Sequence, residues 1–502
     1  MTGHDRTTTV GQLPTPSTTD SHIPAALTRL VWVLWIGSLG ALAVQSLRGA
    51  AWNAAGLVLV DGLTVVMWVT VTFFSGIVHS YSRRYLAGSR TIDRFFGRVF
   101  GFTLAVMILV AADSLVLFGA AWLAMGLLMA DLIGHVDGWP QARAAGSLAR
   151  RYFIVSSLSL AVALGALWWQ TGAATVSGVV SAIEAAPDGA TTPLLVLGAA
   201  AAFLLAAMIQ SALLPFHTWL LSSMTAPTPA SALMHAGFVN AGGILLTRFA
   251  PVVTIDPAVL YAIVLVGAAS AVGGKLMKSV QPDVKTKLGC STVGQMGFMI
   301  MQAGLGFFGA AITHLVLHGF YKAYRFLSAG DAIDHTAPSQ ATHEVADVGP
   351  VGAVVIGVSA LAGGVVFAAL TGKGTTLDTG LVLTGLVVVT TLHATWTALG
   401  RSPLPETVRY GAVPLVFLPA IAVYAATYVA IAGVMKSSLP LVTAPTALTV
   451  VHAVVAAVFL GAYVAIETGF HRRSDRLYVA LVNATRPPTE TTLTAREDYN
   501  EY

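Results

Sequence analysis

Long apolar segments follow one another along the chain, and short polar or charged segments separate them. An apolar segment of about 20 residues is long enough to cross a hydrocarbon layer roughly 30 Å thick. Within such a layer each segment must satisfy its own backbone hydrogen bonds, so these segments are expected to be helices. The pattern predicts an all-α, polytopic membrane protein of about 14 transmembrane helices. The expected helices are 30–47, 56–80, 98–112, 114–134, 150–170, 192–212, 228–249, 258–280, 288–305, 308–329, 350–370, 380–399, 411–435 and 446–468.

The same pattern divides the chain into three parts. Residues 1–28 are polar, rich in Thr, Ser and Pro, and without the apolar centre of a signal peptide. They are predicted to form a flexible cytoplasmic tail. Residues 29–470 are predicted to form the transmembrane domain, and residues 471–502 a cytoplasmic C-terminal tail.

Prolines and charges interrupt the apolar pattern at two places. Residues 213–229 contain Pro215, Pro227 and Pro229, and proline lacks the backbone donor that a helix interior needs. Residues 281–289 are charged and lie between two apolar segments. Helices broken at membrane depth often mark transport sites. The pattern predicts an interrupted helix at 213–229. It leaves 281–289 open between a second interruption and a surface loop that joins two whole helices.

The composition excludes an ordinary soluble protein. Of the 502 residues 56% are hydrophobic and 10% are charged, whereas a soluble domain has about 25% charged residues. The net charge of +4 does not indicate nucleic-acid binding, because the basic residues lie mostly in short segments between the apolar ones. Cys290 is the one cysteine, so the chain can form no internal disulfide and no cysteine cluster for a metal.

The positively charged segments predict the orientation of the chain. Segments 81–98 and 135–151 are rich in arginine, whereas segment 171–191 holds acidic residues and no Lys or Arg. Cytoplasmic segments carry an excess of Lys and Arg, so the first two are expected inside and the third outside. The arginines of 472–476 place the C-terminus inside as well. We therefore expect a multi-pass protein of the cell (inner) membrane with both termini in the cytoplasm.

Three ionisable residues share one face of the expected helix 308–329. His314, His318 and Lys322, called the row below, are spaced four residues apart and therefore align along one side of an α-helix. Charged groups at membrane depth cost about 3 kcal/mol each on insertion scales, so they are functional candidates. Histidine titrates near neutral pH and a desolvated lysine can release its proton, so the row is predicted to pass protons. A metal or haem site at the two histidines is the weaker alternative, because the sequence offers no third ligand nearby.

Other ionisable residues are candidates for the same path. His235 lies alone on an apolar segment and is predicted to act in a relay, with a histidine that bonds a neighbouring helix as the alternative. His217 lies at the proline interruption, where a structural and a functional role are equally open. Lys275 and Lys285 are included in the path, and a basic edge facing the cytoplasm is the alternative for such lysines. Among the aspartates near helix ends, Asp131 is predicted to lie within the membrane.

The chain has no sequence pattern for catalysis. No glycine-rich phosphate loop, catalytic serine motif or zinc-ligand spacing occurs in it. The sequence therefore predicts a transporter subunit rather than an enzyme, with no cofactor and no metal in this chain. Any chemistry beyond ion movement would come from a partner.

Three long motifs resemble the antiporter-like membrane subunits of respiratory complex I and of the Mrp antiporters. They are LPFHTWLLSSMTAPTPASALMHAGFVNAGGILLTRFAP (214–251), DVKTKLGCSTVGQMGFM (283–299) and HLVLHGFYKAYRFLSAG (314–330). Within that superfamily the first motif is most similar to the DabB family, the membrane subunits of the DabA–DabB inorganic carbon transporters. The resemblance covers roughly residues 55–335.

The resemblance implies an antiporter-like fold with interrupted helices and a partner chain. The partner would be a DabA-like zinc protein on the cytoplasmic side, which uses a gradient of H+ or Na+ to drive conversion of CO2 to bicarbonate. His235 matches a histidine of the family's broken-helix region, the row matches its His/His/Lys helix, and Lys285 falls in its charged stretch. The function implied is that of a proton-conducting subunit of an energy-coupled inorganic carbon transporter.

Two departures from the family bear on the mechanism. Complex I subunits have a glutamate where this chain has Leu123, and a lysine where it has Gln210. The resemblance implies that this Glu–Lys pair gates pumping, so its absence favours a proton path that serves a partner over a stand-alone pump. A cation/proton antiporter or complex I-like subunit is the alternative of the same class. A membrane anchor that binds a soluble enzyme and conducts nothing is the alternative of another class.

Overall fold

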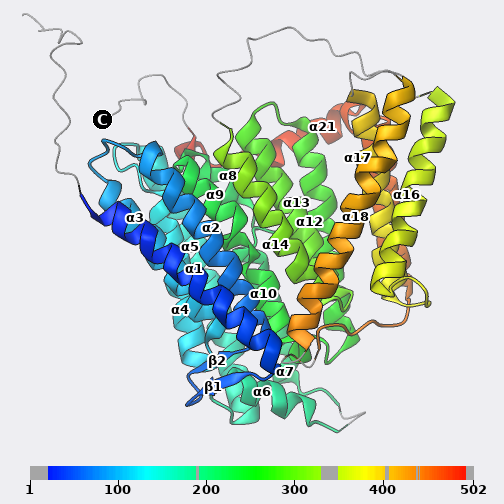
Figure 1. The fold of residues 1–502 in the computed structure, drawn as a ribbon. Coiled ribbons are helices and arrows are strands. Elements are labelled where there is room, and N and C mark those ends of the chain that lie inside the picture. Colours follow the sequence, from blue (N-terminus) through cyan, green and yellow to red (C-terminus); the bar gives the residue numbers. More distant parts are fainter. Residues whose placement is uncertain are drawn as a thin grey trace, which may run out of the picture.

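The computed structural model describes residues 21–187, 191–329, 349–401, 406–436, 439 and 441–492. Its long helices lie side by side in a bundle, and the antiparallel hairpin of β1 (Trp52–Ala54) and β2 (Val58–Val60) lies at one end, called the hairpin end below (Figure 1). The helices are α1 (Ile23–Arg48), α2 (Gly62–Tyr85), α3 (Ile92–Ala111), α4 (Leu115–Ile133), α5 (Pro140–Thr171), α6 (Val176–Glu184), α7 (Leu194–Gln210), α8 (Thr218–Ser222), α9 (Thr228–Ala236), α10 (Ala241–Arg248), α11 (Ala250–Val253), α12 (Pro257–Val280), α13 (Val284–Gly304), α14 (Phe308–Leu327), α16 (Gly349–Thr371), α17 (Thr379–Arg401), α18 (Glu406–Lys436), α19 (Val450–Glu467), α20 (Phe470–Arg473) and α21 (Asp475–Ala484), with 3-10 turns at Ser223–Thr225, Phe238–Asn240 and Thr489–Thr491.

Within the described ranges, 11 helical segments are long and apolar enough to cross a membrane, which confirms the predicted all-α, polytopic fold class. One of them, Thr228–Arg248, is formed by α9, a 3-10 turn and α10 together. The predicted number of fourteen is not confirmed. α7 is shorter than these helices, and α13 and α14, which carry much of the polar site described below, are not among them. α1 begins at Ile23, ahead of the predicted position 30, and Pro24 in its first turn suits a helix start. Residues 1–20 of the predicted tail lie outside the described residues.

Charged segments gather at the two opposite ends of the bundle. At one end, an ion pair between Arg94 and Asp137 (2.5 Å) joins the two arginine-rich segments. At the hairpin end, Asp113 accepts hydrogen bonds from Asn53 Nδ2 (2.9 Å) and from Ser177 Oγ (2.8 Å). The segments predicted to lie inside and outside are therefore at different ends, and which end faces the cytoplasm stays a prediction.

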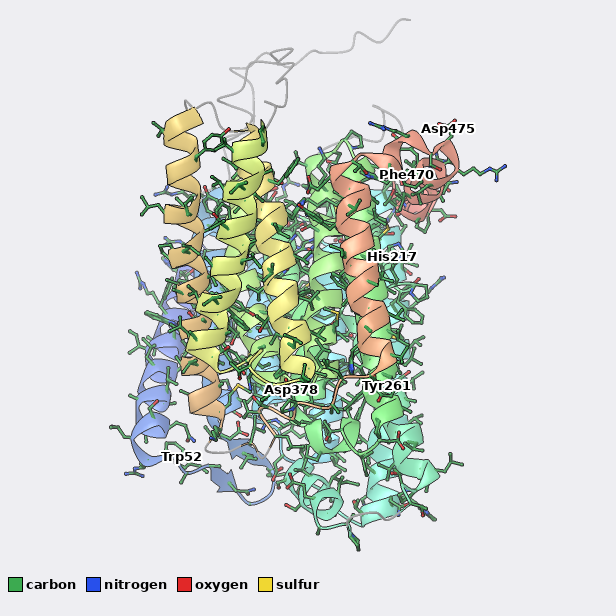
Figure 2. The ribbon with its side chains drawn as sticks, turned by 90° about the vertical axis from the view of Figure 1, so that its right-hand side faces the viewer. Trp52, His217, Tyr261, Asp378, Phe470 and Asp475 are labelled. Carbon is green, nitrogen blue, oxygen red and sulfur yellow. The ribbon has the colours of Figure 1, made fainter. Side chains whose placement is uncertain are left out.

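The C-terminal helices α20 and α21 lie at the arginine-rich end, across the molecule from the hairpin. Phe470 and Asp475 mark this end in Figure 2, and Trp52 marks the other. Asp378 and Tyr261 lie toward the hairpin end in the same view. α12 and α17 therefore run from the hairpin end toward the arginine-rich end, because these two residues are near their starts.

The structure confirms the predicted helix interruption at 213–229. α7 ends at Gln210, and the chain resumes as the short α8 before α9 begins at Thr228. The backbone groups freed by the interruption find partners: Trp219 Nε1 donates to the oxygen of Ile209 (2.9 Å), and Leu214 N donates to Ser270 Oγ (3.1 Å). These bonds meet the requirement that broken helices in a bundle interior satisfy their polar backbone groups.

Segment 281–289 joins two whole helices and is not a second interruption. α12 ends at Val280, and Asp283 caps the start of α13 by accepting hydrogen bonds from the backbone of Lys285 and Thr286. Partial burial raises the pKa of the Asp283 carboxyl, but these hydrogen bonds outweigh burial and leave the pKa below its usual value. Behind the turn the two helices pack closely, since a Cβ at Gly274 would lie 2.3 Å from the backbone nitrogen of Gly294.

A second interruption occurs next to His235, which the residue pattern does not predict, although the resemblance places His235 in a broken-helix region. The expected helix 228–249 is divided into α9 and α10 by Gly237 and the 3-10 turn Phe238–Asn240. Asn240 Nδ2 donates to the oxygen of Ala236 (2.7 Å) and so satisfies one of the carbonyls at the break. The prediction of one continuous helix is wrong here, because no proline marks the break and apolar periodicity continues through it. His235 therefore lies in the last turn of a short helix.

Candidate functional site

The row lies inside the protein on α14. Lys322 is 0% exposed and His318 is 6% exposed, and His314 is partly buried. The rings of His314 and His318 stack with their centroids 5.9 Å apart, as the four-residue spacing predicts. α9, α10, α13 and α18 pack around α14. The row therefore faces the interior of the bundle rather than its outer surface.

A backbone carbonyl joins the row to His235. Lys322 Nζ donates to the oxygen of Leu288 at 2.7 Å, and Thr292 Oγ1 donates to the same oxygen at 2.9 Å. His235 Nδ1 lies 2.9 Å from Thr292 Oγ1, and the imidazole stacks on Phe326 with ring centroids 4.4 Å apart. The structure thus brings together two predicted site residues, on α9 and α14, through groups of α13.

The hydrogen bonds define which nitrogen of His235 carries the proton. The Thr292 hydroxyl gives its one proton to the Leu288 carbonyl, so Nδ1 of His235 is the donor and Nε2 is an acceptor. Nε2 of His235, like those of His314 and His318, is buried and has no hydrogen-bond partner among the described residues. Such an unsatisfied group costs about 1–3 kcal/mol. Ionisable groups at membrane depth that are left unsatisfied in this way are functional candidates.

Gly319 allows α14 to lie this close to α9. A Cβ at Gly319 would lie 2.9 Å from the backbone oxygen of Ala236 and 2.5 Å from Cε2 of Phe74. We expect Gly319→Ala to push the helices apart at the row, at a cost of about 1–3 kcal/mol in stability, and to slow proton transfer. Fluorescent-maleimide labelling of Cys290, which is buried, during heating of the purified protein measures the stability.

Gly357→Ala on α16 is the matched control for this prediction. A Cβ at Gly357 has nothing within 4 Å, so alanine is expected to leave the melting temperature unchanged or slightly raise it. Equal melting temperatures and equal proton transfer for the two variants would contradict the role given to Gly319.

Polar side chains continue from the row toward the hairpin end, and the sequence analysis missed them. Gln302 Nε2 donates to Tyr424 Oη at 3.4 Å, and one turn further along α18 the hydroxyl of Tyr428 lies 3.5 Å from Thr443 Oγ1. Gln302 is 0% exposed, and its Oε1 has no hydrogen-bond partner among the described residues. Single Gln and Tyr residues in apolar helices carry no spacing signal. Gln302 lies one turn along α13 from Phe298, whose ring packs on His314 with centroids 5.4 Å apart, so these polar groups lie beyond the His314 end of the row.

No hydrogen bond between described residues joins the remaining predicted path residues to the row. Lys285 Nζ donates to the oxygen of Met224 at 3.2 Å, at the end of the first interruption. His217 Nε2 lies 2.8 Å from the oxygen of Ala484 and so holds α21 to the bundle. Lys275 bonds a histidine of α17 and is considered further below. The roles predicted for these three in a proton path stay predictions.

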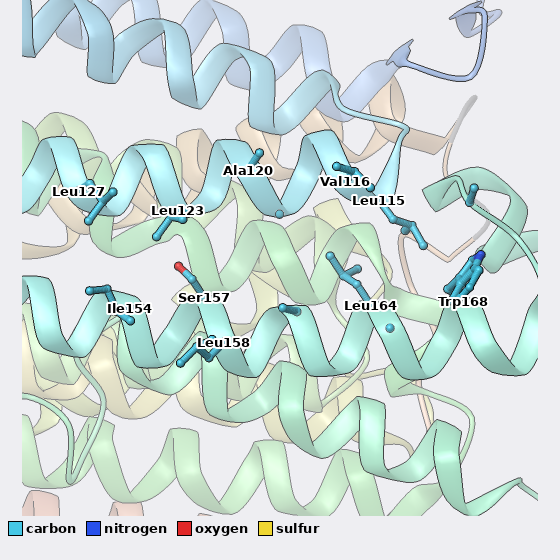
Figure 3. Close-up of a pocket in the computed structure, with 14 residues that line it drawn as sticks. Leu115, Val116, Ala120, Leu123, Leu127, Ile154, Ser157, Leu158, Leu164 and Trp168 are labelled. Carbon is cyan, nitrogen blue, oxygen red and sulfur yellow. The ribbon is translucent and has the colours of Figure 1, made fainter.

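The two departures from the family pair lie in different environments. Leu123 is 37% exposed and lines an apolar groove of about 840 Å³ between α4 and α5, together with Leu158 and Trp168 (Figure 3). Gln210 is fully buried at the end of α7, and neither amide atom has a hydrogen-bond partner among the described residues. Neither side chain can hold a titrating proton, so the Glu–Lys pair that the resemblance implies has no counterpart at these positions.

Asp131 belongs to a charge cluster at the arginine-rich end and not to the buried interior. It forms an ion pair with Arg150 at 2.5 Å, and both side chains are partly exposed. Beside it, Arg98 donates to His135 Nδ1 at 3.3 Å. Burial, and then the positive charges of Arg98 and Arg94, lower the pKa of His135 to about 4. His135 is therefore neutral at neutral pH and accepts a hydrogen bond from Arg98.

A buried ion pair that the sequence analysis missed holds α10 to α2. Arg248 bonds both carboxylate oxygens of Asp61 and also donates to the oxygen of Val110 at 2.7 Å. Asp61 in turn accepts a hydrogen bond from the backbone of Thr64 at 2.9 Å and caps α2. The side chains are 4% and 0% exposed. An arginine inside an otherwise apolar segment was the available signal, because such a charge needs a buried partner.

Metal ligands do not gather in the part of the chain that the structure describes. Within it, no group of three or more His, Cys, Asp or Glu residues comes together. The two histidines of the row have no third protein ligand among the described residues.

A helical membrane bundle with an interrupted helix and a buried line of titratable side chains defines a class of ion-translocating membrane subunits. Residues 112–400 match the family described as NADH:quinone oxidoreductase/Mrp antiporter, transmembrane. Residues 53–96 match the family described as NADH-ubiquinone oxidoreductase (complex I), chain 5 N-terminus. The chain therefore belongs to the superfamily of complex I and Mrp antiporter-like subunits, which includes DabB, as the motifs predicted.

Named relatives are similar to parts of this chain. A probable inorganic carbon transporter subunit DabB1 of Halothiobacillus neapolitanus is 40% identical over 304 residues, covering 60% of this chain and 53% of its own length. A probable inorganic carbon transporter subunit DabB of Bacillus subtilis is 37% identical over 328 residues, covering 64% and 63%. NADH-ubiquinone oxidoreductase chain 5 of Cryptococcus neoformans is 37% identical over 283 residues, covering 56% and 42%. The matches thus span about half the length of these relatives.

A solved structure confirms the fold alone. A chain of the Mrp complex from Dietzia sp. DQ12-45-1b aligns with a TM-score of 0.54 at 23% identity, covering 92% of this chain and 51% of that chain. The antiporter-like arrangement of helices predicted from the motifs is therefore confirmed over most of the chain.

Proposed function

We propose that this chain is the proton-conducting membrane subunit of an energy-coupled inorganic carbon transporter, acting with a DabA-like zinc protein. The observation that carries the proposal is the buried row on α14, joined to His235 through the Leu288 carbonyl. The relatives named as probable inorganic carbon transporter subunits support the substrate class, and the word subunit supports a partner chain.

The geometry of the row supports proton movement along α14. Adjacent members are one helical turn apart, and each has a basic nitrogen inside the bundle. His318 lies between the other two, so it can take a proton from one neighbour and give it to the next. The polar groups around Gln302 and Tyr424 extend this interior toward the hairpin end. In this proposal they connect the row to the outer side of the membrane.

The missing Glu–Lys pair shapes the proposal. Leu123 and Gln210 cannot exchange protons. In this proposal protons therefore move down their gradient through this chain to drive the partner, and the chain does not complete a pumping cycle of its own. The partner then carries out the conversion of CO2 to bicarbonate, with its own zinc. We place the partner on the arginine-rich, cytoplasmic end, where the charged segments lie.

Uptake of labelled inorganic carbon tests the proposal. The chain is co-expressed with the protein of the adjacent gene in a bacterial host that lacks carbonic anhydrase, and uptake is measured within the first minute after adding labelled bicarbonate. We expect uptake that needs both proteins and stops when a protonophore collapses the gradient. Uptake that survives collapse of the proton gradient and stops on removal of Na+ indicates a sodium-coupled subunit.

Two other outcomes contradict the proposal. Uptake that survives the loss of all ion gradients indicates a membrane anchor that conducts nothing. Ion exchange by this chain without any partner, and without effect on carbon uptake, indicates an antiporter or complex I-like subunit.

A further inference from the structure

Three titratable side chains from three helices are joined by hydrogen bonds beside the row, and they are called the triad below. Lys275 Nζ of α12 lies 2.6 Å from His393 Nε2 of α17, and His393 Nδ1 lies 2.5 Å from Glu467 Oε1 of α19. The side chains of His393 and Glu467 are 29% and 16% exposed, so the triad is largely inside the bundle. The sequence analysis gave His393 and Glu467 no role, because they lie far from Lys275 in the sequence.

The chemistry of the triad is suited to passing a proton along its two hydrogen bonds. With Lys275 as the ammonium, His393 neutral and protonated on Nδ1, and Glu467 as the carboxylate, every short contact is a proper donor–acceptor pair. The ammonium can pass a proton to Nε2 while Nδ1 passes its proton to Oε1. The amine then becomes neutral, the imidazole changes tautomer, and the carboxylate becomes a carboxylic acid. The three groups together have no net charge before or after the transfer, so burying them costs less free energy than burying an unpaired charge.

The triad lies toward the arginine-rich end of the bundle. Lys275 lies in the last turns of α12, and Glu467 is the last residue of α19. Figure 2 shows Phe470, just beyond α19, at that end. A proton that reaches Glu467 is therefore close to the arginine-rich end of the bundle.

Electrostatic interactions of one lysine connect the triad to the row. Lys278, one turn along α12 from Lys275, interacts electrostatically with both Lys275 and Lys322. A positive charge on Lys278 therefore acts on both Lys275 and Lys322, because like charges in a low-dielectric interior repel strongly.

We propose that Lys275, His393 and Glu467 form the proton outlet of this protein at the arginine-rich end. The inference rests on the proposed function, since it assigns an exit to the path whose interior part is the row. It adds two residues, His393 and Glu467, that neither the motifs nor the relatives' names indicate.

The alternative is that the triad is a hydrogen-bonded clamp that holds α17 and α19 against α12. His393→Gln separates the two roles, because a glutamine can donate to Glu467 and accept from Lys275 but cannot change tautomer to pass a proton. Glu467→Gln likewise keeps a hydrogen-bonding side chain and removes the proton acceptor. A clamp tolerates both changes, whereas an outlet does not. Asp475→Asn, an exposed acid-to-amide change at the same end, is the matched control.

The test measures proton uptake by the full-length purified chain in vesicles that contain a pH-sensitive dye, with a potassium diffusion potential as the driving force. We expect His393→Gln and Glu467→Gln to lower the initial rate at least about tenfold, with Asp475→Asn and the Cys290 melting curves unchanged. Rates equal to wild type in both glutamine variants would overturn the outlet and leave the clamp. A wild-type protein that conducts nothing would instead overturn the proposed function, and the outlet with it.

Discussion

Replacing Lys322 with methionine is expected to abolish proton transfer and leave the fold intact. The Lys322 amine has one acceptor among the described residues, the Leu288 carbonyl, and the residue is 0% exposed. Without the amine, a proton on His318 has no titratable group one turn ahead of it, so the rate should fall on the order of a hundredfold. Methionine has a similar length and no charge to bury, so the melting temperature should not fall. Proton uptake into vesicles and Cys290 labelling during heating measure the two quantities.

Lys287→Met is the matched control for this variant. Lys287 lies in the first turns of α13, near Leu288 but outside the row, and undergoes the same chemical change. It is expected to conduct like the wild type. If Lys322→Met conducts like Lys287→Met, or if both lose the fold, the assignment of the row as the proton path is wrong.

Arg248→Met is expected to have the largest effect on stability. It leaves the carboxylate of Asp61 buried at the hairpin end without its positive partner. Removing one member of a buried ion pair costs about 3–5 kcal/mol, a large part of the stability of a typical protein. The expected result is a clear fall in the melting temperature, measured by the labelling of Cys290, which becomes accessible on unfolding.

The double variant Asp61→Asn with Arg248→Met tests the cause of this loss. Asparagine keeps an oxygen to cap Thr64 and carries no charge, so the double variant is expected to recover much of the stability. A double variant that is as unstable as the sum of the two single variants would contradict the ion-pair explanation.

Most of the fold could be predicted from the sequence, because apolar length alone identifies a membrane helix. The interruption at 213–229 was also predictable, since prolines mark it. The interruption at Gly237 was not predictable from the residue pattern, because no proline marks it and the apolar residues continue through it. The number of spans stayed open for a related reason: α13 and α14 replace apolar residues with the polar groups of the site.

The site was predictable where its residues share one helix and not where they come from several. The spacing of His314, His318 and Lys322 placed them on one face, and the structure places that face inside the bundle. The link from Lys322 to His235 depends on a backbone carbonyl, which no residue pattern reveals. The contact between His393 and Lys275 depends on how α17 packs on α12 and α19, and a single sequence holds no information on such pairs.

Proton conduction by the unmodified chain tests the central claim most directly. Purified full-length protein in vesicles is given a potassium diffusion potential, and the internal pH is followed against protein-free vesicles of the same lipid. The account predicts acidification that grows with the amount of protein and is unaffected by replacing Na+ with a large organic cation. Internal pH changes no faster than in protein-free vesicles would contradict it.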